Sequence, residues 1–369
     1  MKVTIFTYIP SPYQVELFNA IARSKNSFSL SVFYIYSKLH AHLAKHSSVA
    51  NLWGKPPIEH NHLMIDDAGR RKAKARAAAA SSDLVIFNYY RHPFTADLVK
   101  ERVCSKKMWC FWGERPGYGR FGRLGALYRR WRLYTLYRWN VPIWGIGKWA
   151  VEGYRREFGE NHRYFNLPYF SDLSGFSRVG HKEPYDKERI FLFSGSLIYR
   201  KGADLLASAF SKLAEDFPHV KLYFMGEGRL RPWLEKKLAK QKDRVRFLGF
   251  RPWKDLPQYY KKAHFLCVPS RYDGWAVTVP EGLAAGLPVI STDRTGAALE
   301  FIKEGQNGWI IPTGKKEALY KAMKEAVLLS SDELSKRSRN ARMSIADHSL
   351  EGGVHRFCDA VSEILGSRA

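Results

Sequence analysis

Cysteine is scarce in this chain of 369 residues, and long apolar runs are missing. The four cysteines include no CxxC pair, so neither a disulfide framework nor a zinc site is indicated. Cys110 and Cys267 lie inside apolar runs, which predicts reduced core thiols in a cytosolic compartment. No apolar run approaches the roughly 20 residues that span a bilayer. The start, MKVTIFTYIP, is too short and too β-rich for a secretory signal. A soluble globular chain with two cores is expected.

Acidic residues are also few relative to basic ones. The chain has 60 Lys+Arg and 35 Asp+Glu, a net charge of +25. Residues 1–170 hold 27 basic and 11 acidic side chains, a net of +16, and the remainder holds 33 and 24, a net of +9. The first half is therefore expected to face an anionic partner, such as nucleic acid, a membrane surface or a phosphate-bearing substrate. No RNP, helix-turn-helix, KH or zinc signature supports nucleic-acid binding.

Apolar runs with strand character alternate with helical patterns. These runs are residues 3–9, 29–36, 84–90, 108–113, 141–147, 189–196, 220–226, 245–250, 264–269, 288–292 and 308–312. This alternation predicts parallel sheets covered on both faces.

The predicted fold class is α/β, with two doubly wound, Rossmann-like domains facing a cleft. An N-terminal domain is expected over 1–170, a polar linker over 171–188 and a second domain over 189–349. The tail, 350–369, is expected to form a helix that packs back on the N-terminal domain. Ligands of doubly wound folds bind at the carboxyl ends of the strands, so the cleft is the expected site.

Two glycine loops follow strands of the second half. In FSGSLIYRKGADLL, a strand runs into a loop and Arg200-Lys201-Gly202 opens a helix. Backbone amides at a helix N-terminus and a lysine can bind an anion, although a solvated basic turn would have the same sequence. Gly226-Glu227-Gly228 repeats the pattern. Alone it is weak evidence, because tight strand-to-helix turns use glycine anyway.

The segment PSRYDGWAVTVPEGLAAGLPVIST places Asp273 and Glu281 with seven residues between them. A helix is expected from near Thr278 to Gly286, and the amides before it, Gly274 to Val277, are expected to face a ligand. Two structural alternatives remain open. Thr278-x-x-Glu281 fits a capping box, in which the glutamate bonds only the N-cap amide, and Asp273 fits an Asp-Gly turn.

The order of these pieces over residues 190–328 resembles the retaining, GT-B-fold glycosyltransferases of family 4 (glycosyl transferases group 1), of the bacterial surface-polysaccharide type. In the first half, YIPSPYQVELFNAIA and FWGERPG resemble the family more loosely. The resemblance implies transfer of a hexosyl-type sugar from a UDP- or GDP-sugar to a glycan acceptor, lipid-linked in many relatives. It implies no cofactor and no metal. A sugar-nucleotide epimerase with the same fold is an alternative, against which the paired acids and the Lys-Gly loop speak.

The resemblance also implies roles for residues. Glu281 would grip the donor ribose, Asp273 would face the transferred sugar, and Lys201 would hold the diphosphate. Glu114 stands where many relatives have an active-site histidine, and is the fourth expected catalytic residue. The implied nucleotide-sugar contacts are Ser196, Arg200, Lys201, Gly226, Glu227, Phe250, Arg251, Gly274, Trp275, Ala276, Val277 and Glu281. The implied acceptor contacts are Tyr13, Gln14, Arg91, His92 and Glu114.

Several of these positions depart from the family pattern. Asp273 is one methylene shorter than the usual glutamate, and Ala276 stands where many relatives have glycine. Ser196 stands where relatives often have arginine, so that Arg200 would substitute. Glu114 and His92 also have structural alternatives: an exposed acid paired with Arg115, and a histidine without a catalytic role.

Residues 115–139 contain seven arginines, seven aromatic residues and no acid. Helical spacing places Leu124, Leu127, Tyr128, Trp131 and Tyr134 on one face, with the arginines away from it. This pattern predicts a helix lying on an anionic membrane, through Arg129, Arg130, Trp131 and Arg132. The predicted location is cytoplasmic and peripheral, on the inner face of the cell membrane. A core-packed helix with a basic outer face is the alternative.

Overall fold

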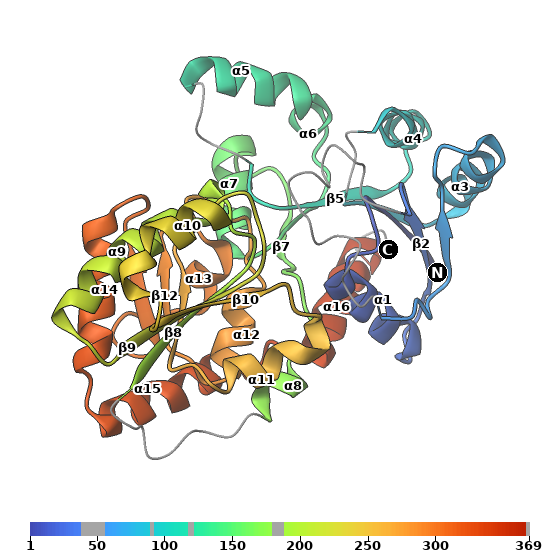
Figure 1. Ribbon diagram of the computed structural model, residues 1–369. Helices are drawn as coiled ribbons and strands as arrows, with labels where there is room; N and C mark the ends of the chain where they lie inside the picture. Colours follow the sequence, from blue (N-terminus) through green and yellow to red (C-terminus); the bar gives the residue numbers. More distant parts are fainter. Residues whose placement is uncertain (38–55, 89–91, 117–121, 179–187, 367–369) are drawn as a thin grey trace. The chain divides into compact units, whose positions relative to one another are not determined.

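The computed structural model describes residues 1–37, 56–88, 92–116, 122–178 and 188–366 (Figure 1). These residues fall into two compact units. Unit 1 takes in the chain up to Ser171 and the last helix, and unit 2 runs from Asp172 to Ser349. The two-domain α/β architecture is as predicted. Among the described helices, none has the length and hydropathy needed to cross a bilayer.

Unit 1 is built on a seven-stranded parallel sheet in the order β3-β2-β1-β4-β5-β6-β7. The strands are β1 (Lys2–Thr7), β2 (Ser29–Tyr34), β3 (His62–Met64), β4 (Leu84–Phe87), β5 (Trp109–Gly113), β6 (Ile143–Gly145) and β7 (Tyr164–Asn166). The helices are α1 (Pro12–Arg23), α3 (Gly69–Ser81), α4 (Pro93–Cys104), α5 (Gly122–Arg132), α6 (Tyr134–Arg138), α7 (Lys148–Phe158) and α16 (Leu350–Gly366).

Local sequence explains these elements. The four residues of β4 are all buried, as expected of a central parallel strand that is covered on both faces. Helix α1 begins with Pro12 in its first turn, where the missing N–H costs nothing. Helix α16 contacts α1, and Phe357 packs against the rings of Phe28 and Trp144. The last helix is thus part of the core of unit 1.

Unit 2 has a six-stranded parallel sheet in the order β10-β9-β8-β11-β12-β13. The strands are β8 (Arg189–Ser194), β9 (Val220–Met225), β10 (Val245–Gly249), β11 (Phe265–Val268), β12 (Val289–Thr292) and β13 (Gly308–Ile311). The helices are α8 (Ser174–Ser177), α9 (Ala203–Asp216), α10 (Arg231–Lys237), α11 (Leu256–Tyr260), α12 (Thr278–Ala284), α13 (Gly296–Phe301), α14 (Lys316–Leu328) and α15 (Ser331–Ser344).

Helices cover both faces of the unit 2 sheet. Phe191 and Phe193 of β8 join a buried cluster with residues of α9, α10 and α14. On the other face, α12 lies so close to β11 that a side chain at Gly282 would collide with Leu266. Alternate residues of the central strands therefore serve two cores, which explains why these strands are apolar throughout.

The strand order of unit 2 is that of a doubly wound, Rossmann-like fold. Strand β8, the first of the unit, pairs with β9 on one side and β11 on the other. The chain order therefore reverses between β8 and β11. The sheet of unit 1 has the same order, with its reversal between β1 and β4.

The structure differs from the predictions at three places. Strands β3 and β7 were not predicted; each has only three residues. Within the predicted linker 171–188, residues 174–177 form α8, and Phe176 is fully buried against Trp253 and Tyr260. Residues 179–187 of that linker lie outside the described part of the chain.

Candidate active site

The loops that follow β8 and β11 meet where the strand order of unit 2 reverses. Gly202 permits this approach, and Gly226 permits a similar approach between the loops after β8 and β9. Gly202 has φ +74°, and a Cβ there would overlap the carbonyl oxygen of Pro269. Gly226 has φ +138°, and a Cβ there would overlap the carbonyl oxygen of Gly195. Only glycine satisfies both demands, a left-handed backbone and no side chain. The close backbone packing therefore requires glycine at these positions of the two predicted loops.

Lys201 and Asp273 form an ion pair across this junction. Lys201 ends a short 3₁₀ turn (Tyr199–Lys201) just before α9, and its Nζ bonds the Asp273 carboxylate. Both side chains are largely buried, which strengthens the attraction between them. Asp273 also forms a backbone bridge with Thr295, and its amide donates to Arg294 O at 2.9 Å. The structure thus brings together two of the four residues expected to be catalytic.

Glu281 is buried inside the same unit, with only 2 % of its surface exposed. Its carboxylate accepts hydrogen bonds from Tyr260 Oη at 2.9 Å and from Trp253 Nε1 at 3.3 Å. Burial, followed by the nearby Glu281 charge, raises the pKa of Tyr260 well above its usual range, although a hydrogen bond with Ser194 opposes this. Tyr260 therefore remains a donor over the physiological pH range and fixes the orientation of the carboxylate.

The capping-box alternative for Glu281 is wrong. The N-cap of α12 is Val277, and no side-chain cap bond forms there. The Glu281 side chain turns to Tyr260 and Trp253 instead. Sequence reasoning missed these two partners. They lie 21 and 28 residues upstream of Glu281, and no sequence pattern predicts that their elements contact α12.

The loop between Asp273 and α12 presents backbone amides. In the described part of the chain, the N–H groups of Gly274, Trp275, Ala276 and Val277 have no hydrogen-bond acceptor. Such amides can hold an anion. The Trp275 side chain is buried against Phe301, so that only its backbone can serve a ligand. Ala276 takes φ +67°, a left-handed conformation that favours glycine.

The other expected donor-site residues lie around the same strand ends. Glu227 follows β9 and bonds Arg231, and its Oε1 lies 3.1 Å from the position that a Cβ would take at Gly249, at the end of β10. Phe250 and Arg251 come next, and the Arg251 guanidinium lies 5.3 Å from the centre of the Tyr259 ring. Ser196 lies in the loop after β8, which also carries Arg200.

Arg200 and Arg271 connect the two loops. Arg200 Nη1 donates to Tyr272 O at 2.9 Å, so its guanidinium holds the opposite loop. Arg271, which sequence reasoning missed, bonds Asp204 with two nitrogens at 2.7 Å each. No sequence pattern predicts this ion pair, because its partners are 67 residues apart.

In unit 1 a polar network spans the corresponding strand reversal. Thr7 at the end of β1 bonds Asn88 after β4 at 2.8 Å, and Gln14 Nε2 donates to Asn88 Oδ1 at 3.0 Å. Gln14 is buried, and its Oε1 accepts from Ser11 at 2.9 Å. The predicted acceptor residue Gln14 thus has a structural role within unit 1.

Tyr13 and Glu114 lie close to this network. The Tyr13 ring is 4.5 Å from that of Tyr169, centre to centre. Burial raises the pKa of Tyr169 well above its usual range; the charges of Tyr13 and Glu114 add to this, while a hydrogen bond with Asn88 lowers it. The exposed Glu114 is therefore near Tyr169.

The contacts of the remaining predicted residues of unit 1 differ. His92 is the N-cap of α4: its Nδ1 accepts from Phe94 N at 3.3 Å, and Nε2 lies 3.4 Å from Asp67 Oδ1. These contacts fit the structural alternative for His92. The Arg115 guanidinium lies 4.1 Å from the Trp149 ring centre. Arg91 lies outside the described residues.

Helix α5 presents its apolar stripe to solvent. Leu124, Leu127, Tyr128 and Trp131 of α5 and Tyr134 at the start of α6 are 50–70 % exposed, so the alternative of a core-packed stripe is wrong. Arg129 faces the protein, where it pairs with Glu157 of α7 at 3.4 Å, and the Arg130 guanidinium lies 5.5 Å from the Tyr137 ring centre. The side chain of Arg132 lies outside the described part.

Comparisons with known proteins give a family match for unit 2 and a fold for the chain. Residues 179–343 match the family model of glycosyl transferases group 1. Unit 2 is similar to a group 1 glycosyltransferase domain over these residues. The whole chain also superposes on Anabaena HepE in complex with UDP and glucose, with a TM-score of 0.72 at 15 % identity over 98 % of this chain and 99 % of that one. The fold is therefore GT-B, as predicted.

Two curated relatives match part of the chain. One is an uncharacterised glycosyltransferase of Methanocaldococcus jannaschii, 35 % identical over 34 % of this chain and 33 % of that protein. Another is the Campylobacter jejuni enzyme that adds N-acetylgalactosamine to a diphosphoundecaprenol-linked glycan, 26 % identical over 54 % of each chain. The chain thus spans from about a third to about half the length of these relatives.

Proposed function

We propose that this chain is a glycosyltransferase that moves a sugar from a nucleotide-sugar to a glycan acceptor. The observation that carries this proposal is the Lys201–Asp273 ion pair, placed at the strand reversal of a group 1 domain with the buried Glu281 close by in sequence. Three features that a nucleotide-sugar requires come from one unit. They are a cation and free amides for the diphosphate, and a fixed carboxylate for ribose hydroxyls.

The reaction follows from where charge develops. As the bond from sugar to diphosphate breaks, negative charge grows on the leaving group. Lys201 and the amides of Gly274 to Val277 would offset that charge without any reorganisation, which lowers the barrier. Glu281 would accept bonds from the ribose while Tyr260 and Trp253 hold it. Asp273 would orient the hydroxyls of the transferred sugar, and Glu114 would lie on the acceptor side.

The finer assignments are part of the same proposal. The donor is a UDP- or GDP-hexose, and transfer retains the anomeric configuration without a metal. HepE binds UDP and glucose, which supports a uridine donor. The Campylobacter relative acts on a diphosphoundecaprenol-linked glycan, which supports a lipid-linked acceptor. Such an acceptor places the enzyme at a membrane, in surface polysaccharide or glycolipid synthesis.

Helix α5 is the proposed membrane contact. Its exposed Leu, Tyr and Trp side chains would enter the headgroup region of the inner leaflet. The net charge of +16 over residues 1–170 favours anionic lipid, at about 1 kcal/mol for each basic residue near the surface. Arg129 is paired with Glu157, so it would hold α5 in place rather than bind phosphate.

The donor can be identified by thermal unfolding with UDP-, GDP- and dTDP-sugars, with UMP as a control that lacks the diphosphate. The proposal predicts that one diphosphate-linked sugar raises Tm. At a hundred times its Kd it should add about 2.7 kcal/mol to the free energy of unfolding. UMP should add much less. If no nucleotide-sugar raises Tm while duplex DNA does so in a salt-dependent manner, the proposal is wrong and nucleic-acid binding is favoured.

A further inference from the structure

Two ion pairs join the two loops at the strand reversal of unit 2. The loop and helix start after β8 supply Lys201 and Asp204, and the loop after β11 supplies Arg271 and Asp273. Lys201 pairs with Asp273, and Arg271 pairs with Asp204. Each loop thus gives one cation and one anion to the other. Two ion pairs, side by side in sequence, hold the same junction, and their geometries differ.

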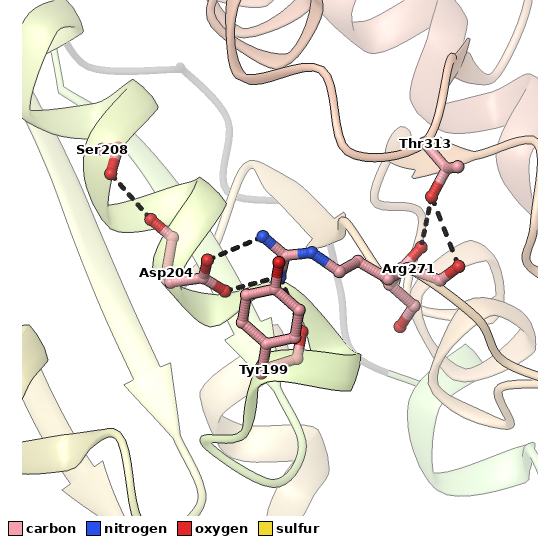
Figure 2. A network of polar contacts seen from close by, with 6 residues as sticks. Tyr199, Asp204, Ser208, Arg271 and Thr313 are labelled. Carbon is pink, nitrogen blue, oxygen red and sulfur yellow. Dashed lines mark hydrogen bonds and ion pairs between the residues drawn. The ribbon is translucent and has the colours of Figure 1, made fainter. Parts of the chain in front are cut away.

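The Arg271–Asp204 pair is rigid. Both guanidinium nitrogens bond the carboxylate at 2.7 Å, and the side chains are only 20 % and 19 % exposed. The guanidinium also lies 3.5 Å from the centre of the Tyr199 ring and donates to Tyr199 O at 2.7 Å. Figure 2 shows Arg271 reaching Asp204 beside Tyr199. Because a planar fork matches a carboxylate in two bonds and stacks on a ring, this pair fixes orientation as well as distance.

One further bond ties the same two segments, and two others fix each of them to its own surroundings. The Arg271 amide donates to Arg200 O at 2.8 Å, and Thr313 Oγ1 lies 3.4 Å from Arg271 O. On the α9 side, Ser208 Oγ donates to Asp204 O at 2.9 Å (Figure 2). The clamp, defined as Arg271, Asp204 and Tyr199, is thus anchored at both ends.

The Lys201–Asp273 pair is of the opposite kind. A lysine is a point charge on a flexible stem, and it bonds a single carboxylate oxygen. In the proposed function Lys201 binds the donor diphosphate, so donor binding removes a bond that joins the loops. Something else must then keep the loops together.

We propose that Arg271 is a positioning residue. With Asp204 it keeps the two loops in register, so that Lys201 can leave Asp273 for the diphosphate while Asp273 becomes available to the sugar. This inference rests on the proposed function for the exchange step, but the clamp itself can be tested without any ligand.

The test compares Asp204→Asn and Arg271→Lys with a matched control, Lys212→Met. Lys212 is on α9 like Asp204, and its pair with Glu317 joins two elements of unit 2 but is exposed on both sides. Hydrogen exchange of the Lys201, Gly202 and Arg271 amides should become at least about tenfold faster in the two clamp variants only. UDP affinity, measured by calorimetry, should weaken about tenfold in the same two variants.

A thermodynamic cycle separates positioning from general stability. If the clamp acts through Lys201, then Asp204→Asn should weaken UDP binding little further in the Lys201→Ala background. Additive losses, or unchanged exchange in the clamp variants, would overturn the inference. Faster exchange combined with no UDP or GDP binding by the wild type would leave the clamp as a structural device, and would count against the proposed function instead.

Discussion

Ala276 is a single residue at which this chain departs from the expected pattern, and the structure gives the departure a physical cost. Its φ of +67° lies in the left-handed region, where a Cβ crowds the backbone by about 1–2 kcal/mol. Glycine would remove that cost but would lose more backbone entropy on folding. We therefore predict that Ala276→Gly raises the free energy of unfolding in urea by about 0.5 kcal/mol.

The control for this prediction is Ala209→Gly, in the middle of α9. There the same change should lower the free energy of unfolding by about 1 kcal/mol, since the helical backbone gains nothing from glycine. Equal destabilisation by both substitutions would mean that Ala276 is not strained.

Sequence reasoning located Glu281 but not its surroundings. The spacing of Asp273 and Glu281 was enough to single out both acids. It could not decide between a capping glutamate and a ligand-facing one, because both have the same local sequence. The structure excludes the capping role, because the Glu281 carboxylate bonds Tyr260 and Trp253 through tertiary contacts; its contact with a ligand stays a prediction. Arg271 of the clamp was not predicted for the same reason, since its contact with Asp204 is also tertiary.

At the scale of elements, period and composition predicted nearly every strand. The exceptions, β3 and β7, are the edge strands of the unit 1 sheet. Each has three residues, none of them buried, whereas the equally short β6 is buried throughout and lies in a longer apolar run. Helix α16 appears at 350–366 as expected. The face that α5 presents to solvent was not predictable, because an apolar stripe has the same spacing whether it meets a core or a membrane.

The exposed stripe of α5 leads to a prediction at this scale. Replacing Leu127 and Trp131 together by serine should lower binding to anionic liposomes about tenfold or more, since each apolar side chain gives up about 1.5–3 kcal/mol of burial on leaving the headgroup region. Transfer to a soluble acceptor analogue should be unchanged. Co-sedimentation with phosphatidylglycerol vesicles measures the loss.

Trp233→Ser serves as the control, because Trp233 is exposed on α10 of unit 2 and is outside the proposed contact. If the double variant binds vesicles as well as the control does, α5 is not the membrane contact.

For the whole molecule, the order of elements was more informative than any single motif. The alternation of apolar strands and helices indicated two doubly wound sheets, and the strand orders of both units agree. The order of the glycine loops and the paired acids indicated the resemblance to a glycosyltransferase family. The total charge of +25 indicated only an anionic partner. Donor and acceptor identity were not predictable, because specificity depends on a few side chains that shape the pockets.

The central claim is that unit 2 binds a nucleotide-sugar through Lys201 and Glu281 and that the chain transfers its sugar. The most direct measurement is the rate of release of nucleoside diphosphate from the donor found by thermal unfolding, in the presence of acceptor, for the wild type, Glu281→Gln and Lys201→Ala. The account predicts that each substitution lowers kcat/KM about a hundredfold, the scale of one lost electrostatic contact with a developing charge. The control Lys212→Met should match the wild type. Near-normal turnover in both Glu281→Gln and Lys201→Ala would contradict it.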